Sequence, residues 1–152
     1  MTTTESPLSS PELPGTPVHS GTCRLQITGD DPWGRQVAGR VPFEVRFDPA
    51  CPYDLTVVYG RPSRARQYAV LRELLALGRV EPVAGVDNRV VVLPELDEVI
   101  AVCWPRPDGR RDTLLFDRVD VETVLDATEY VHNAAIDEDL AELLAAEGGG
   151  AR

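Results

Sequence analysis

Lysine is absent from this sequence of 152 residues, so all fifteen of its cationic side chains are arginine. Acidic residues number 25, and the formal net charge is −10 at pH 7. Nucleic-acid-binding proteins draw much of their affinity from Lys and Arg side chains that displace counterions from phosphates. Because acid outweighs base in this chain, we expect no nucleic acid among its partners.

Long hydrophobic runs are also missing. Runs such as residues 90–93 are far shorter than the roughly 20 apolar residues that a membrane-spanning helix needs. The first ten residues, MTTTESPLSS, contain neither the basic segment nor the apolar segment of a secretory signal peptide. We therefore expect no membrane span and a cytoplasmic location.

Side chains suited to catalysis or metal binding are scarce. The chain has two histidines, His19 and His132, and three widely separated cysteines, Cys23, Cys51 and Cys103. No zinc-binding spacing and no phosphate-binding glycine loop occur. We predict no catalytic residue, no metal site and no cofactor, and interpret the cysteines as small buried apolar side chains. An enzyme with a cysteine nucleophile is the alternative to this interpretation.

The chain divides into three parts by composition. Residues 1–20 hold four prolines and no aromatic residue, so they lack the apolar surface that would offset the entropy of ordering. We predict a disordered tail over residues 1–21, a folded domain over residues 22–147 and a flexible end over residues 148–152.

Alternation with period two predicts strands in the first two thirds of the domain. Cys23, Leu25 and Ile27 alternate with polar residues, and so do the apolar residues between Val41 and Phe47. The two patterns indicate an antiparallel hairpin whose other face, with Glu44 and Arg46, lies in water. Further strands are predicted at residues 53–59, 89–93, 99–104 and 112–116. Residues 64–78 fit a helix with Gly78 as its C-terminal cap, but their first part also fits a strand, so we expect an extended entry near residues 66–70 and a short helix at residues 71–77.

The last third changes to helical periodicity. Asp120 is a good N-cap for a helix with apolar residues on one side, and Asp137 is a good N-cap for a second helix. We expect Leu140, Leu143 and Leu144 of this second helix to face the core. Because strands precede helices, the fold class is α+β, with antiparallel sheets flanked by a short helix and C-terminal helices.

Charge is unevenly distributed along the chain. Residues 61–79 carry five arginines and one acid, whereas residues 117–147 carry ten acids and one arginine. The basic segment is either a site for an acidic partner segment or a solvated strand edge. Its candidate partner-binding residues are Arg61, Arg64, Arg66 and Arg72. Trp33, in a turn at residues 29–34, is a candidate interface anchor.

Four stretches of the sequence carry a resemblance to a known family. They are Phe47, Asp48 and residues 52–55; residues 72–75 with Gly78, Pro82 and Gly85 before the strand at 89–93 and Pro94; residues 99–104, Pro107, Gly109 and residues 113–116; and residues 121–128, Ile136, Asp137, Leu140, Leu143 and Leu144. By their order and spacing, residues 22–146 resemble the SsgA-like sporulation and cell-division regulators of actinobacteria.

This resemblance implies an α+β unit with two antiparallel sheets and flanking helices, similar to the whirly fold that binds single-stranded DNA. It implies a homotrimer without catalytic activity. It also implies a role in sporulation-specific septation, with partners among the cell-division proteins associated with the GTPase FtsZ and recruitment to the septum. The alternative is a single-stranded nucleic-acid-binding module of whirly-like fold.

Overall fold

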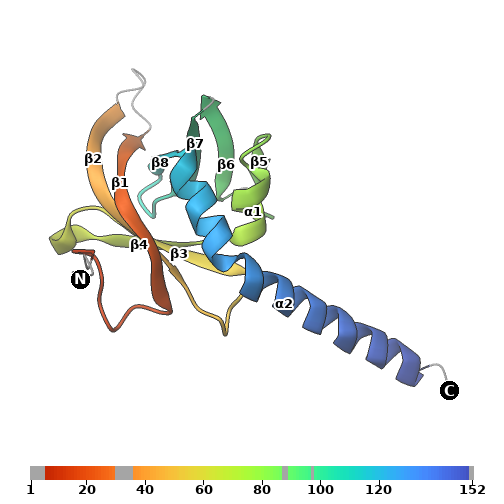
Figure 1. The fold of residues 1–152 in the computed structure, drawn as a ribbon. Coiled ribbons are helices and arrows are strands. Elements are labelled where there is room, and N and C mark those ends of the chain that lie inside the picture. The colour runs from red at the N-terminus through yellow and green to blue at the C-terminus, as the bar shows by residue number, and fades with distance from the viewer. Residues whose placement is uncertain (1–5, 30–35, 87–88, 97, 151–152) are drawn as a thin grey trace.

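The structure of the chain, a computed structural model, describes residues 6–29, 36–86, 89–96 and 98–150. Its elements are β1 (Thr16–Thr28), β2 (Gln36–Phe47), β3 (Asp54–Tyr59), η1 (Pro62–Arg64), β4 (Arg66–Leu71), α1 (Arg72–Leu77), β5 (Val83–Ala84), β6 (Val91–Leu96), β7 (Val99–Pro105), β8 (Arg111–Asp117) and α2 (Arg118–Gly150). Figure 1 shows these elements as a curled sheet with a long C-terminal helix that extends beyond it.

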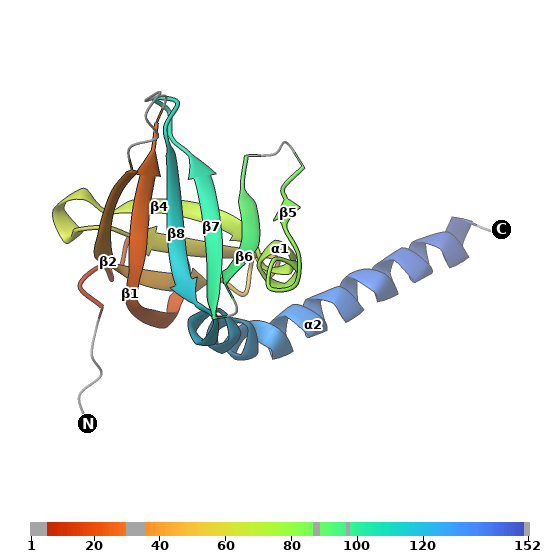
Figure 2. The same cartoon turned by 90° about the horizontal axis from the view of Figure 1, so that it is seen from above.

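The eight strands form one antiparallel sheet in the order β4-β3-β2-β1-β8-β7-β6-β5. The α+β class and the antiparallel pairing are therefore confirmed, but the two expected sheets are the two ends of one sheet. The sheet curls, so that β3 and β4 lie behind β1, β8 and β7 (Figure 2). The concave side encloses the core.

An aromatic stack joins the two ends of the curled sheet. The Trp104 ring from β7 lies 5.8 Å from the Tyr59 ring of β3 and 5.4 Å from the Tyr68 ring of β4, measured between ring centroids. Tyr59 Oη donates a 2.6 Å hydrogen bond to Asp112 Oδ2, and Arg106 Nε lies 2.9 Å from Asp112 Oδ1. Burial, together with this hydrogen bond, raises the pKa of Tyr59. The stack holds β3 and β4 against β7.

The predicted hairpin of β1 and β2 is confirmed, and its register pairs Cys23 with Val41. Its outer face differs from the sequence expectation. Glu44 and Arg46 are buried rather than wet, and Arg46 Nη1 donates a 2.6 Å hydrogen bond to Glu44 Oε1. A buried ion pair needs further hydrogen bonds to offset its lost hydration, and the N-terminal segment provides them.

The N-terminal segment at residues 6–15 packs against β2. Leu8 is buried, and the Arg46 guanidinium donates hydrogen bonds to the Gly15 carbonyl at 2.7 Å and the Pro14 carbonyl at 3.0 Å. β1 begins at Thr16, so the expected boundary at residue 21 and the expected disorder of residues 6–20 do not match the structure. Local composition suggested a tail because the contacts that order this segment come from a distant strand.

The expected extended entry near residues 66–70 and the short helix after it are confirmed by β4 and α1. Gly78 is the C-cap of α1, with a right-handed φ of −66°. The reason for glycine at this position is therefore steric. A Cβ atom on Gly78 would lie 2.1 Å from Val92 Cγ1 on β6, well inside van der Waals contact. Helix α1 and strand β6 touch because this side chain is missing.

The two expected C-terminal helices are one helix, α2, of 33 residues. Asp137 is not an N-cap but lies within it. Residues 131–136 contain neither proline nor glycine, so nothing in the chain stops the helix there. Gly148–Gly150 are also helical, in contrast to the expected flexible end. The second half of α2 extends away from the sheet (Figure 1), and Leu140, Leu143 and Leu144 are exposed rather than buried.

Candidate protein-interaction surfaces

Three of the predicted partner-binding arginines lie together at one end of the molecule. Arg61 precedes the exposed turn η1, Arg64 is its last residue, and Arg66 begins β4. Among the described residues, none of the three forms an ion pair. Beside them is a groove of about 400 Å³ between the N-terminal segment and β3 and β4. We call Arg61, Arg64, Arg66 and this groove the arginine groove; its lining is Leu8, Ser10, Glu12, Leu13, Val58, Pro62, Ala65, Arg66 and Gln67.

Arg72 does not belong to this surface. It is buried, and its guanidinium joins the two helices by donating to Thr128 Oγ1 at 2.9 Å and to the Leu125 carbonyl at 2.7 Å. Burial lowers the pKa of Arg72. Its position on a short helix against α2 gives it a structural role, and it is not accessible to a partner. Trp33 lies outside the described residues.

A second surface is the free part of α2, which we call the C-terminal arm and define as residues 133–150. The arm carries five acidic residues and no basic residue. Leu140, Leu143 and Leu144 are each more than half exposed, at 52%, 62% and 68%. Sequence reasoning expected them in the core because apolar residues at helical spacing usually pack inward. Their exposure makes the arm the most conspicuous unpartnered feature of the described structure.

The arm leaves the body of the protein at His132. This side chain is buried, its Nδ1 lies 3.1 Å from the Pro52 carbonyl, and its ring packs edge-on against Tyr53. About two helical turns further along α2, Asp139 accepts a hydrogen bond from Tyr53 Oη. An acidic groove of about 510 Å³ lies here between residues 49–54 and one side of the arm. These contacts fix the direction of the arm without covering its leucines.

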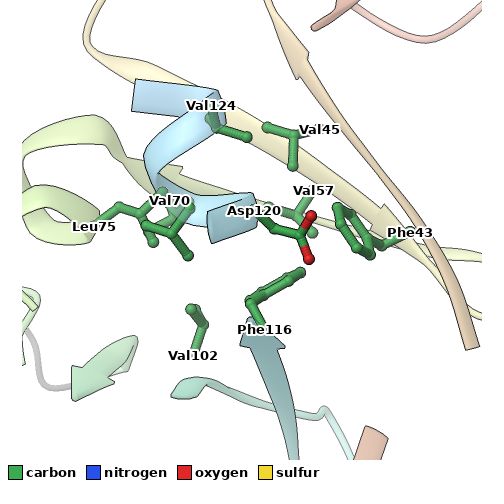
Figure 3. Close-up of a pocket in the computed structure, with 10 residues that line it drawn as sticks. Phe43, Val45, Val57, Val70, Leu75, Val102, Phe116, Asp120 and Val124 are labelled. Atoms are coloured by element: carbon green, nitrogen blue, oxygen red, sulfur yellow. The ribbon is translucent and has the colours of Figure 1, made fainter. Parts of the chain in front are cut away.

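The cavity that the described residues enclose under α2 is too small for a substrate. A cavity of about 20 Å³ lies under the start of α2, which is space for about one water molecule. Figure 3 shows apolar side chains such as Val57, Phe116 and Val124 pointing into this space, with Asp120 at its edge. Asp120 Oδ1 is paired with His19 Nε2 at 2.7 Å, so the acid expected to cap the helix links α2 to β1 instead.

The outer face of the sheet is a third open surface. Figure 2 looks onto β1, β8 and β7 from this side, and no described helix lies in front of them. A groove of about 220 Å³ crosses it. Arg24 and Arg40 line the groove together with Glu95 and Asp117, so its charge is mixed. A groove of mixed charge does not have the uniformly basic lining that tracks a phosphate backbone.

Two of the solved structures that match this architecture are sporulation cell-division proteins. One is SsgB, a protein whose mutations correlate with longitudinal cell division during sporulation of Streptomyces coelicolor; it has a TM-score of 0.58 and 22% identity, over 76% of this chain and 88% of its own. The other is an SsgA-like sporulation-specific cell division protein from Thermobifida fusca, with a TM-score of 0.55 and 18% identity, over 82% of this chain and 95% of its own. The chain has the SsgA-like fold. No family model and no curated protein matches its sequence.

Two features are absent from the described part of this SsgA-like fold. There, no three His, Cys, Asp or Glu side chains are placed to hold a metal ion, and no helix is apolar and long enough to cross a bilayer. The expectation that all three cysteines are buried is wrong. Cys23 is buried, Cys103 is half-buried, and Cys51 is exposed on the turn between β2 and β3.

The buried Cys23 thiol is expected to make this SsgA-like fold less stable at alkaline pH. Burial raises the pKa of its thiol from 9.0 to about 12, so between these values the folded chain keeps a proton that the unfolded chain releases. Stability is therefore full below pH 9 and falls as pH rises toward 12, by up to about 1.4 kcal/mol per pH unit. Urea unfolding from pH 8 to 11 measures this slope.

A Cys23→Ala variant is the control for this prediction. It should show a shallower fall above pH 9, with a remainder from Tyr59, whose pKa is also raised. Equal slopes for the variant and the wild-type protein would contradict the assignment to Cys23.

Proposed function

We propose that this protein is a non-enzymatic regulator of sporulation-specific cell division that acts through protein–protein interaction. The observation that carries the proposal is the fold shared with SsgB and with the SsgA-like protein from Thermobifida fusca, both of them sporulation cell-division proteins. The open surfaces support it, because the described structure presents an acidic arm and an arginine groove. Its expected place is the cytoplasm and the forming septum.

The proposed partners are of two kinds. One is the cell-division machinery associated with FtsZ, which the protein would help to position during septation. The other is the protein itself, as a homotrimer. The arginine groove favours an acidic partner segment, because three guanidinium groups that form no ion pair with any described residue lie around a groove with the accessible apolar residues Leu13, Pro62 and Ala65. Trp33 is the proposed aromatic anchor.

A role in binding single-stranded nucleic acid is less well supported. The net charge is −10, and the groove on the outer face of the sheet contains Glu95 and Asp117 opposite its two arginines. Binding of this kind depends on a basic groove and weakens steeply with salt.

The test uses the purified full-length chain and purified FtsZ from the same host. We expect the chain to co-sediment with FtsZ polymers, and the Trp33→Ala variant to do so less. Tyr130→Ala is the matched control, because it removes an aromatic side chain that is 85% exposed on α2 and is not a proposed anchor. Deletion of the gene in the host should disturb septation during sporulation while vegetative growth continues.

Two results would contradict the proposal. One is the absence of both FtsZ binding and a septation defect. The other is binding of a single-stranded oligonucleotide at low salt that declines with added salt, which would favour the nucleic-acid alternative.

A further inference from the structure

The C-terminal arm has an apolar face that no described residue of the single chain covers. Leu140, Leu143 and Leu144, with the half-buried Ile136, recur at the spacing of one helix face. Asp137 and Glu147 belong to the same side of the helix by this spacing, whereas Glu138 and Glu142 line the acidic groove on the other side. The arm therefore presents one apolar face with acidic groups around it.

The arm is also weakly stabilised on its own. Beyond His132 it contacts the body at residues 49–54. Glu147 and three glycines occupy its last turns, where a negative charge opposes the helix dipole and glycine costs backbone entropy. Apolar packing from outside would supply the stability that the sequence of the arm lacks.

The arginine groove is complementary to the arm and lies at the opposite end of the molecule. Figures 1 and 2 both show the turn of η1 on one side of the molecule and the free end of α2 on the other. The arginine groove there offers accessible apolar residues, Leu13, Pro62 and Ala65, with Arg61 and Arg64 exposed beside them. Glu12, which also lines the groove, is the acidic exception. Charge and polarity therefore match between the two ends.

We propose that the C-terminal arm of one copy docks into the arginine groove of a second copy. The arm cannot reach its own groove, because α2 is a continuous helix that points away from it (Figure 1). Two arms do not suit each other, since each carries five acidic and no basic residues. A contact between unlike surfaces joins copies head to tail, which yields a ring if it closes and a filament if it does not. The inference rests on the proposed self-association and gives it a mechanism.

The experiment measures self-association of the full chain by sedimentation velocity at several concentrations. Asp137→Arg with Glu147→Arg reverses charge on the apolar side of the arm, and Arg61→Glu with Arg64→Glu reverses charge at the groove. We expect each pair to weaken association by about tenfold or more, because like charges then meet at the contact. All four changes in one chain should restore most of the wild-type association.

Two further variants separate this contact from general effects of charge. Glu138→Arg with Glu142→Arg makes the same charge change on the other side of the arm, and should weaken association much less. Leu140→Ser with Leu143→Ser leaves the charge unchanged and should also weaken association. All of these residues are exposed in the single chain, so circular dichroism should show an unchanged fold.

The outcomes distinguish this inference from the proposed function. A wild-type chain that stays monomeric at high micromolar concentration overturns both the self-association and the docking. An oligomer that none of the arm variants disturbs overturns the docking alone and leaves the leucine face for a different protein. Failure of the four-change chain to recover, or an equal loss in the control pair, also overturns the docking. Normal docking without FtsZ binding would contradict only the proposed function.

Discussion

Replacing Trp104 with alanine is expected to lower the free energy of unfolding by about 3–5 kcal/mol. Trp104 is among the largest fully buried side chains and stacks on Tyr59 and Tyr68 from the opposite end of the curled sheet. Its removal leaves a cavity at the only aromatic contact described between β7 and the pair β3 and β4. Because single domains have about 5–15 kcal/mol of stability in total, the loss is a large share.

Urea unfolding followed by circular dichroism measures this effect. Trp104→Phe should cost much less, because Trp104 Nε1 has no hydrogen-bond partner among the described residues and the smaller ring keeps part of the stack. Tyr130→Ala, at an aromatic residue that is 85% exposed, should leave stability nearly unchanged. A Trp104→Ala loss as small as that of Tyr130→Ala would show that the stack does not hold the sheet closed.

Replacing Gly78 with alanine is expected to destabilise the protein by about 1–3 kcal/mol through overpacking. Helix propensity alone predicts the opposite sign, because alanine is favoured over glycine in a helix by about 1 kcal/mol. The contact decides the outcome. The added Cβ would lie 2.1 Å from Val92 Cγ1 and 2.6 Å from Val92 Cβ, and Val92 is fully buried on strand β6.

A double-mutant cycle with Val92→Ala tests this explanation. Val92→Ala removes the Cγ1 atom that would clash, so the two substitutions together should cost at least about 1 kcal/mol less than the sum of the single losses. Additive losses would mean that Gly78 matters for a reason other than its contact with β6. Chemical denaturation of the four proteins gives the required free energies.

Local patterns in the sequence predict much of this fold. Alternation located the strands because the side chains of a strand face opposite sides of a sheet, a rule that needs only neighbouring residues. The entry of β4 into α1 and the cap at Gly78 were also local features. The pairing of strands was predicted in part, since β1 and β2 pair as expected. The curl of the sheet was not predicted, because it brings together Tyr68 and Trp104, which are 36 positions apart in the sequence.

Features that depend on distant partners were not predictable from these patterns. Arg46 looked like a solvent-facing residue because the groups that cover it are backbone carbonyls 31 to 33 residues earlier in the chain. The composition of residues 6–15 therefore predicted a tail. In the structure, backbone carbonyls of this segment accept hydrogen bonds from the buried Arg46 guanidinium. Asp137 resembled an N-cap because it precedes an apolar helical pattern. The residues before it do not end a helix, so α2 continues through this position.

The candidate surfaces were predicted in part for the same reason. The arginines at 61, 64 and 66 form an exposed group because they are close in sequence and lie in a turn and at a strand end. Arg72 differs because its helix is turned toward α2, where Thr128 and the Leu125 carbonyl accept its hydrogen bonds. The leucines of the arm had the pattern of a core helix, and only the three-dimensional structure shows that no described residue covers them.

The order of the strands also determines when a growing chain can complete its fold. Strand β1 pairs with β8 through five residue pairs, from Arg24 with Leu115 to Thr28 with Arg111. On the ribosome, β1 to β4 emerge first and can pair with one another, but β8, the second neighbour of β1, is made only after β5, β6 and β7. Until then the nascent protein exposes an unpaired β1 edge, which places its greatest need for chaperones before β8 leaves the exit tunnel.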